Sequence, residues 1–445
     1  MFPCRHGATA WLGVAITSMA FMGIYAFLMV VARAPGFNLL FSDQEFFKTA
    51  LVTHVVLAVV IWFLGFIIFM MYYVTAGTET KTVELLAAAG ALLGVGLIVA
   101  TPFTGPASPL LNNYVPVLAR PLYFAGISVF FGFAALGVIL RAPVLLKATF
   151  GGGQLAWAKG LSLLAAGAAL IVAIICFAIA WTQVSGNPEI AMSRMFFESL
   201  FWGGGHVLQF ANTLGLMAAW AILAKKIAGN EIVPNKMAAA ILALMLVLVL
   251  AAPFYYLSSG ALTVESRRFY LLLKAWGLSF GPIIFGLAAV KMLYSSGGEG
   301  YVRRGLALSV FLFAVGGLIA LTIEGSDTRI PAHYHGTIGS VTLAFMTTGL
   351  VAMVENGRLN VAGKWLTRQL TVYGVGQSLF SLGMYIGGYH GLPRKTFGQA
   401  QQLDDLAKQI GMGIMGIGGF FAIISGVVYV IFMIKALSKR KPAAA

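Results

Sequence analysis

Long apolar segments joined by short polar connections dominate the chain. Twelve runs of about 20 or more mainly apolar residues can be recognised, each long enough to cross the roughly 30 Å hydrocarbon core of a bilayer. They cover residues 9–33, 48–76, 83–103, 118–141, 155–183, 193–225, 237–257, 268–294, 303–324, 331–356, 367–391 and 408–436. No long linker or low-complexity tract interrupts them. The pattern predicts an all-α polytopic membrane protein with one twelve-helix domain over residues 1–445.

The composition agrees with this class. Hydrophobic residues make up 60% of the 445 residues and charged residues only 10%, which leaves too little polar surface for a soluble globule. Cys4 and Cys176 are the only cysteines. Neither a disulfide framework nor a thiolate cluster is therefore available, and any metal chemistry has to use nitrogen ligands.

The net charge of +15 indicates membrane topology rather than binding to nucleic acid. When the loops are assigned alternately to two sides, one side carries 18 of the 29 lysines and arginines. By the positive-inside rule this side is cytoplasmic, and both termini lie on it. Its basic residues are Arg5, Lys81, Arg141, Lys147, Lys159, Lys225, Lys226, Lys236, Lys291, Arg303, Arg304, Arg358, Lys364, Arg368, Lys435, Lys439, Arg440 and Lys441.

Four histidines lie at membrane depth on three predicted helices that all run inward from the outer face. With a rise of ~1.5 Å per residue, His335 lies about 6 Å, His54 about 9 Å and His206 about 20 Å into its helix. Any one of them alone would be interpreted as a hydrogen-bonded core histidine. Because ionisable residues within a bilayer are costly and usually mark function, we interpret the set as a functional site.

The fourth of these histidines, His333, is two residues from His335. At ~100° per residue, positions i and i+2 of an α-helix point about 200° apart. The two imidazoles therefore cannot share one metal ion comfortably. The spacing predicts two ligands held side by side, one on each face of the helix.

The segments around these histidines resemble the heme-copper oxidase superfamily, which includes cytochrome oxidases and nitric oxide reductases. The four segments are Asp327-Thr-Arg-Ile-Pro-Ala-His333-Tyr-His335 for its tenth helix, Phe47-Lys-Thr-Ala-Leu-Val-Thr-His54 for the second, Trp202-Gly-Gly-Gly-His206-Val for the sixth, and Gly391-Leu-Pro-Arg394-Lys395 for the stretch after the eleventh. They occur on the corresponding helices in the same order. With the twelve helices, the resemblance covers nearly the whole chain.

The resemblance implies two hemes, which we expect to be b-type. His54 and His335 would be the axial ligands of a low-spin heme, and His333 the proximal ligand of a high-spin heme. A heme with two histidine ligands passes electrons, whereas a heme with one protein ligand keeps a position for a gas. Arg394 and Lys395 would pair with heme propionates; for Lys395, a simple interfacial charge pair is an equal alternative.

The polar segment before the tenth helix also carries Asp327 and Arg329. These two residues are candidates for the same polar cap over the hemes. An exposed ion pair within a turn is the alternative, and such a pair contributes little to stability.

The chain departs from the family at the non-heme metal. That metal, copper in the oxidases and iron in the nitric oxide reductases, needs one histidine on helix 6 and an adjacent pair at the end of helix 7. Only His206 is present, and no histidine occurs between His206 and His333. One imidazole is a poor site for copper or iron, so the resemblance implies an incomplete metal site whose loading is in question.

Other residues near His206 are candidates for supplying protons or oxygen ligands. The family often has tyrosine or glutamate four residues after this histidine, whereas this chain has Phe210. Gln209 and Glu198 lie on the same predicted helix and could take either role. For Gln209, a hydrogen bond between helices is an equal alternative.

Three further polar residues lie in the seventh and eighth predicted helices. Tyr255 and Tyr256 could donate hydrogen bonds or protons to a diatomic ligand on the heme, or they could belong to an aromatic belt at the membrane interface. Lys274 could serve a proton path, or it could lie near the interface if the helix boundary is misplaced.

The resemblance implies a catalytic subunit of a respiratory oxidoreductase that reduces O2 or NO, and the sequence does not rank these gases. The alternative is an electron-transfer subunit between quinol and a periplasmic cytochrome that has lost the second metal. Because no Cys-x-x-Cys-His motif is present, a separate subunit with cytochrome c or a cupredoxin is the implied donor, with quinol a further candidate. We expect a bacterial-type inner (plasma) membrane, with the hemes toward its outer face.

Overall fold

The structure is a computed structural model that describes residues 6–34, 44–76, 78, 81–152, 155–295, 297 and 300–439. Cys4 and the terminal basic residues Arg5, Arg440 and Lys441 lie outside the described residues. The α-helices are α1 (His6–Arg33), α2 (Gln44–Val56), α3 (Trp62–Val74), α4 (Thr82–Ala100), α5 (Pro121–Phe150), α6 (Trp157–Val184), α7 (Arg194–Ala228), α8 (Asn235–Ser259), α9 (Val264–Gly277), α10 (Phe280–Ser295), α11 (Gly300–Ala320), α12 (Arg329–Glu355), α13 (Gly363–Tyr389) and α14 (Leu406–Ser438).

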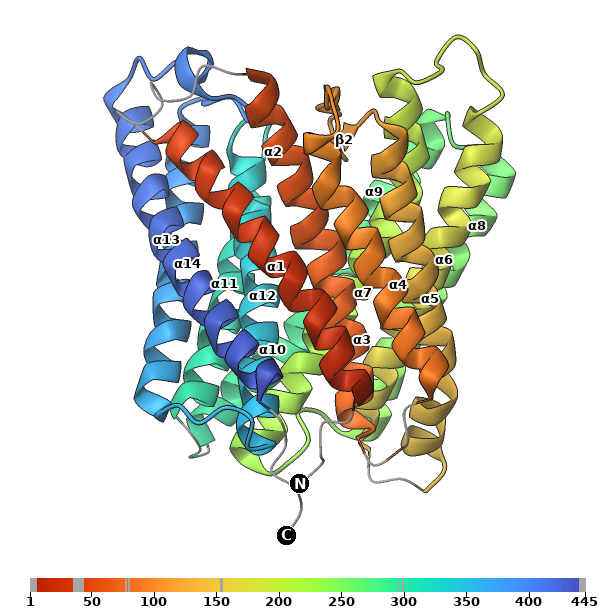
Figure 1. Ribbon diagram of the computed structural model, residues 1–445, viewed down its shortest axis with the longest axis vertical. Coiled ribbons are helices and arrows are strands. Elements are labelled where there is room, and N and C mark those ends of the chain that lie inside the picture. Colours follow the sequence, from red (N-terminus) through yellow and green to blue (C-terminus); the bar gives the residue numbers. More distant parts are fainter. Residues whose placement is uncertain are drawn as a thin grey trace.

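These helices make twelve passes through one bundle (Figure 1). The pass formed by α2 and α3 is continuous through a π-helix, η2 (Leu57–Ile61), and α9 with α10 makes another pass that is broken between them. Over the described residues, eleven of the passes are long and apolar enough to cross a membrane. The twelfth is α13, which carries polar residues such as Gln369 and Gln377. The prediction of an all-α, twelve-helix membrane protein is confirmed.

The two faces of the bundle differ. α1 begins and α14 ends at the face drawn at the bottom of Figure 1. At the opposite face, after the short helix η3 (Thr101–Phe103), the strands β1 (Pro109–Leu110) and β2 (Val117–Leu118) pair antiparallel, and η4 (Gly398–Gln401) follows α13. We call this second face the outer face.

Three passes form the centre of the bundle. In the most apolar segments of α2–α3, of α7 and of α12, 83% of the residues are buried inside the protein, against 33 to 56% in the other eight passes that meet the same apolar criterion. Central passes contact protein on all sides, whereas outer passes expose one face to lipid. The histidines at membrane depth all lie on these central passes.

The predicted end of the fourth helix is wrong. The predicted run ends at residue 141, but α5 continues to Phe150, and Arg141 is not a loop residue. Its side chain is buried, lies 3.6 Å from the Glu84 carboxylate of α4 and donates to Thr75. A buried guanidinium is tolerated when a carboxylate and oxygen acceptors surround it, so the charge does not end the helix.

The π-helix directly after α2 was not predicted. Such a segment adds a residue to a helical turn and leaves backbone carbonyls without their usual partners. Two of these carbonyls accept hydrogen bonds from other helices: Leu57 O from Ser18 Oγ at 2.8 Å, and Val59 O from Asn212 Nδ2 at 3.2 Å. Side chains of α1 and α7 thus stabilise the irregular segment that follows His54.

Candidate functional site

A cavity of about 1800 Å³ lies between the central passes and their neighbours. It exceeds the roughly 300–1,000 Å³ typical of a site for one small ligand. Most of its lining is apolar. Among the described residues, no aspartate or glutamate lines it, and the charged residues that do are Arg33, Lys274, Arg394 and Lys395. A largely apolar cavity with positively charged residues favours ligands that are mainly apolar and carry anionic groups.

The two neighbouring histidines of α12 contact different helices. His333 Nδ1 lies 2.8 Å from the carbonyl oxygen of Gly316 on α11, whereas the ring of His335 lies 4.3 Å from the ring of Phe380 on α13. Both rings line the cavity. The structure therefore places them on opposite faces of one helix, as the spacing predicts.

His54 of α2 lies on the same side of the cavity as His335. The two imidazoles interact electrostatically, and His54 Nδ1 lies 3.0 Å from the carbonyl oxygen of Met22. A carbonyl can only accept, so Nδ1 of His54 and of His333 carries the proton and Nε2 keeps its lone pair. This arrangement, in which a second partner fixes the ring of a metal-ligating histidine, is the usual one.

His206 is placed differently. Its ring is 1% exposed, stacks on Tyr114 with centroids 4.2 Å apart, and is not among the residues that line the cavity. Nδ1 lies 2.5 Å from the carbonyl oxygen of Trp202. Throughout the described ranges, no three histidine, cysteine, aspartate or glutamate side chains cluster to hold a metal ion. Among the described residues, His206 therefore belongs to no such cluster.

Tyr114, in the turn between β1 and β2, connects two of the predicted site residues. Its hydroxyl accepts a hydrogen bond from Gln209 Nε2 at 3.0 Å, and its backbone N–H donates to the Glu198 carboxylate at 3.1 Å. Gln209 and Tyr114 line the cavity, whereas Glu198 is buried behind them. Tyr114 thus lies between the buried carboxylate and the cavity wall, with its N–H and its hydroxyl bonded at opposite ends of the residue.

Tyr255 and Tyr256 pack between α7, α8 and α9 rather than along the cavity. The Tyr255 ring stacks on Phe269 at 3.9 Å. Tyr256 is fully buried, and its hydroxyl accepts a hydrogen bond from the Gly203 N–H at 2.7 Å. The buried hydroxyl of Tyr256 is thus bonded to the backbone of α7, and both roles expected for these tyrosines stay predictions.

Arg394 and Lys395 lie at the outer end of the cavity. Arg394 donates to Asn113, and Lys395 to the carbonyl oxygen of Asn112. Lys395 has φ of 60°, a conformation that residues other than glycine seldom adopt and that recurs at functional sites. Burial, followed by the charge of Arg394, lowers the pKa of the Lys395 ammonium to about 8.

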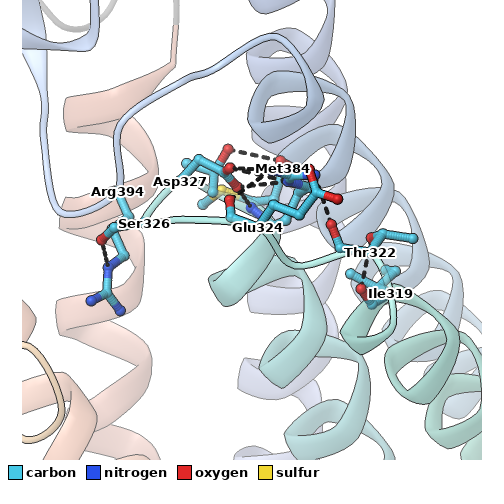
Figure 2. A network of polar contacts seen from close by, with 9 residues as sticks. Ile319, Thr322, Glu324, Ser326, Asp327, Met384 and Arg394 are labelled. Carbon is cyan, nitrogen blue, oxygen red and sulfur yellow. Dashed lines mark hydrogen bonds and ion pairs between the residues drawn. The ribbon is translucent and has the colours of Figure 1, made fainter.

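The connection between α11 and α12 is fixed by its own polar network (Figure 2). Arg329 pairs with Asp327 at 2.7 Å and also donates to backbone carbonyls of the connection. Arg394 Nε donates to Ser326 Oγ at 3.0 Å, which ties the loop after α13 to this network. Asp327 and Arg329 do not line the cavity, so they shape its rim.

Two cavity residues were missed in the sequence. Arg33, at the end of α1, has Nε and Nη2 buried without a hydrogen-bond partner in the described parts of the chain. Gln377 of α13 interacts with the His335 ring. The sequence did carry a signal for each residue: Arg33 ends an apolar run, and Gln377 is an amide within a predicted helix. Buried donors without partners are rare, so Arg33 points to a polar group of a guest.

Comparison with known proteins identifies two relatives in sequence and a known structure with a similar fold. No protein-family model matches the chain. It is 25% identical to an uncharacterized protein of Rickettsia prowazekii (strain Madrid E), over 95% of this chain and 94% of that protein. It is 29% identical to an uncharacterized protein of Aquifex aeolicus (strain VF5), over 80% and 86%. A cryo-EM structure of a heme-copper terminal oxidase dimer matches with a TM-score of 0.78 and 16% identity, over 98% of this chain and 85% of that one.

Proposed function

Because the chain has the fold of heme-copper oxidase subunit I, we propose that it is a heme-bearing catalytic subunit of a respiratory oxidoreductase. In this proposal His54 and His335 would hold a low-spin heme, which would supply electron transfer, and His333 would hold a high-spin heme, which would supply a binding position for a gas. The substrate is a diatomic gas, O2 or NO.

The observation that carries the proposal is the arrangement of three imidazoles around one large cavity. His54 and His335 interact on one side of it, and His333 lies on the opposite face of α12. Two neighbouring imidazoles would hold one heme iron, and the single imidazole of His333 would hold a second one that keeps a position for a gas. The volume of about 1800 Å³ leaves space for more than one large planar guest.

The charged residues of the cavity fit the same guests. Arg394 and Lys395 lie at its outer end, and Arg33 offers two unpaired donor nitrogens. Guanidinium and ammonium groups are the usual partners of carboxylates, so these residues would bind propionates. Bound heme supplies reversible one-electron chemistry and an open iron position for a gas. The protein supplies the two sets of imidazole ligands, excludes water from the cavity and places positive charges near the propionates.

A second function has support of its own. The described residues offer no cluster for a non-heme metal, and His206 is enclosed by aromatic rings. A subunit that retains the hemes but transfers electrons between quinol and a periplasmic cytochrome needs no such metal. In either case the electron donor would be a separate cytochrome c or cupredoxin subunit, or a quinol, and both termini would lie in the cytoplasm of a bacterial-type cell.

The deciding experiment is optical spectroscopy of the purified full-length protein. A reduced-minus-oxidised spectrum is expected to show b-type heme, and addition of carbon monoxide is expected to shift the bands of the high-spin heme only. Heme bands that do not respond to carbon monoxide would favour the electron-transfer function. A protein purified from heme-sufficient cells without any heme would contradict both functions. Metal analysis of the same sample would measure copper and iron beyond the heme iron.

A further inference from the structure

Lys274 brings a charged group to the cavity wall inside the membrane. Its helix, α9, begins at Val264, which puts Lys274 about 15 Å along the helix from the outer face. His206 lies about 18 Å along α7, which runs in the same direction. Lys274 lines the cavity. It therefore lies inside the membrane domain and not at the interface, the other position that the sequence allowed.

Two imidazoles from other helices lie near the Lys274 ammonium. The charge of Lys274 acts through space on the imidazoles of His206 on α7 and His333 on α12, and no hydrogen bond joins these groups within the described residues. α9 packs against α7 and α8, whereas the Nδ1 atom of His333 is held by α11. The ammonium thus approaches the region beside His333 from a wall other than the one that anchors the ring.

The charge of Lys274 has no counter-ion within the part of the chain that the structure describes. No hydrogen bond or ion pair reaches its Nζ atom, and no carboxylate lines the cavity. The three other cavity cations, Arg33, Arg394 and Lys395, lie at the outer end, where propionates would take them. An unpaired ammonium within a bilayer is costly. A small polar or anionic ligand deep in the cavity would partner this ammonium.

We propose that Lys274 forms a cationic subsite for the small ligand of the heme on His333. The ammonium donates a hydrogen bond and lends positive charge to a diatomic gas, or to a small anion such as cyanide, that binds in the cavity beside it. The described residues provide no cluster for a second metal ion, so the lysine gives this position a positive charge without one. The inference rests on the proposed function and deepens it by naming the residue that recognises the ligand.

The test compares full-length wild-type protein, purified with its hemes, with Lys274→Met, Lys274→Arg and Lys291→Met. Cyanide affinity of the oxidised protein is measured by absorption titration, and the C–O stretching frequency of the reduced carbon monoxide adduct by infrared spectroscopy. Lys274→Met is expected to weaken cyanide binding about 10- to 100-fold, the value of a lost hydrogen bond to a charged group. It is also expected to raise the C–O frequency, because less electron density is drawn into the ligand.

Lys274→Arg keeps the charge and is expected to stay near wild type in both measurements. Lys291 lies exposed on α10, away from the cavity, so Lys291→Met controls for the loss of one positive charge and should change neither value. If Lys274→Met does not retain heme, Lys274→Gln replaces it as the neutral variant.

Unchanged cyanide affinity and C–O frequency in the neutral variant would overturn the subsite, even if turnover fell, because a residue that only conducts protons affects turnover alone. Wild-type protein that contains heme but binds neither carbon monoxide nor cyanide would contradict the gas-reducing function, and the subsite with it. Ligand binding by the wild type together with an unaltered neutral variant would contradict the subsite alone.

Discussion

His333 and His335 are neighbours in the chain, but each depends on a different part of the bundle. His333 is held through Gly316 of α11, and His335 contacts Phe380 of α13. The two rings are thus held by different helices, although α11 and α13 also pack against each other. Loss of one ring should therefore affect one ligand site and spare the other.

Replacement of each histidine separately tests this independence. His335→Ala is expected to remove the low-spin heme signal while carbon monoxide still shifts the remaining heme, because His333 keeps its place. His333→Ala is expected to abolish the carbon monoxide response and to leave the low-spin bands. The measurement is the reduced spectrum with and without carbon monoxide. The reverse pattern would exchange the two proposed roles.

The titration of Lys395 provides a second prediction for a single residue. Its pKa is lowered to about 8 by burial and by Arg394, and a heme propionate beside it would raise that pKa. An ammonium stabilises reduced heme, so the heme midpoint potential should fall as Lys395 loses its proton. The midpoint potential should fall by on the order of 59 mV for each unit by which the pKa of Lys395 differs between oxidised and reduced heme. If Lys395 binds a propionate, this fall begins above pH 8 in spectroelectrochemical titrations.

Lys395→Asn is the matched variant, because asparagine tolerates the positive φ of this position. It is expected to lower the midpoint potential at pH 7 and to remove the pH-dependent fall. An equal pH dependence in wild type and variant would show that another group titrates.

At the scale of elements, the close approach of α11 and α12 determines where His333 points. A Cβ atom added at Gly316 would lie 2.6 Å from the backbone nitrogen of Thr337 and 2.8 Å from the carbonyl oxygen of His333. Gly336 faces the same contact, with Gly316 Cα 2.6 Å from its own added Cβ. Glycines on both helices are therefore required for the backbones to approach, and the approach brings the Gly316 carbonyl to His333.

Gly316→Ala is expected to separate the two helices and to destabilise the protein by about 1–3 kcal/mol, as overpacking does. It should also weaken the carbon monoxide response more than the low-spin bands, since the His333 ring loses its anchor. The control is Gly132→Ala on α5, where an added Cβ meets no atom within 4 Å. Equal thermal stability and equal spectra for the two variants would argue against a constraint at the α11–α12 contact.

Sequence patterns predicted some elements well and missed others for physical reasons. The twelve passes and the opposite orientation of His333 and His335 follow from apolar length and helical period, both local properties. The π-helix after His54 depends on Ser18 and Asn212, which lie far away in the chain. The enclosure of His206 depends in the same way on Tyr114. Contacts of this kind are set by tertiary packing, which no local pattern contains.

For the whole molecule, the even number of passes places the start of α1 and the end of α14 on one face. The basic residues that the structure describes on this face include Lys225 and Lys226 at the end of α7, whereas Arg394 and Lys395 line the cavity near the other face. If the proposed hemes are bound, an electron donor that is not part of the chain would approach them from this outer face.

Cysteine labelling tests this orientation. In a background with serine at both native cysteines, Ser185→Cys in the α6–α7 connection should react with a membrane-impermeant maleimide in intact spheroplasts. Asn230→Cys in the α7–α8 connection should react only after lysis, because positively charged loops stay in the cytoplasm. Both positions are exposed. The opposite labelling pattern would invert the orientation and place the cavity mouth toward the cytoplasm.

The single residue between His333 and His335 also limits how the molecule can move. The two rings are attached about 3 Å apart along one helix axis, so a rigid-body displacement of α12 carries both by the same amount. Their spacing therefore depends on the stiffness of one helical turn and is insensitive to bilayer thickness or to subunits docking on the rim. Electron tunnelling decays steeply with distance, and tunnelling between groups held by these two rings would cross a gap that fluctuations elsewhere in the bundle do not modulate.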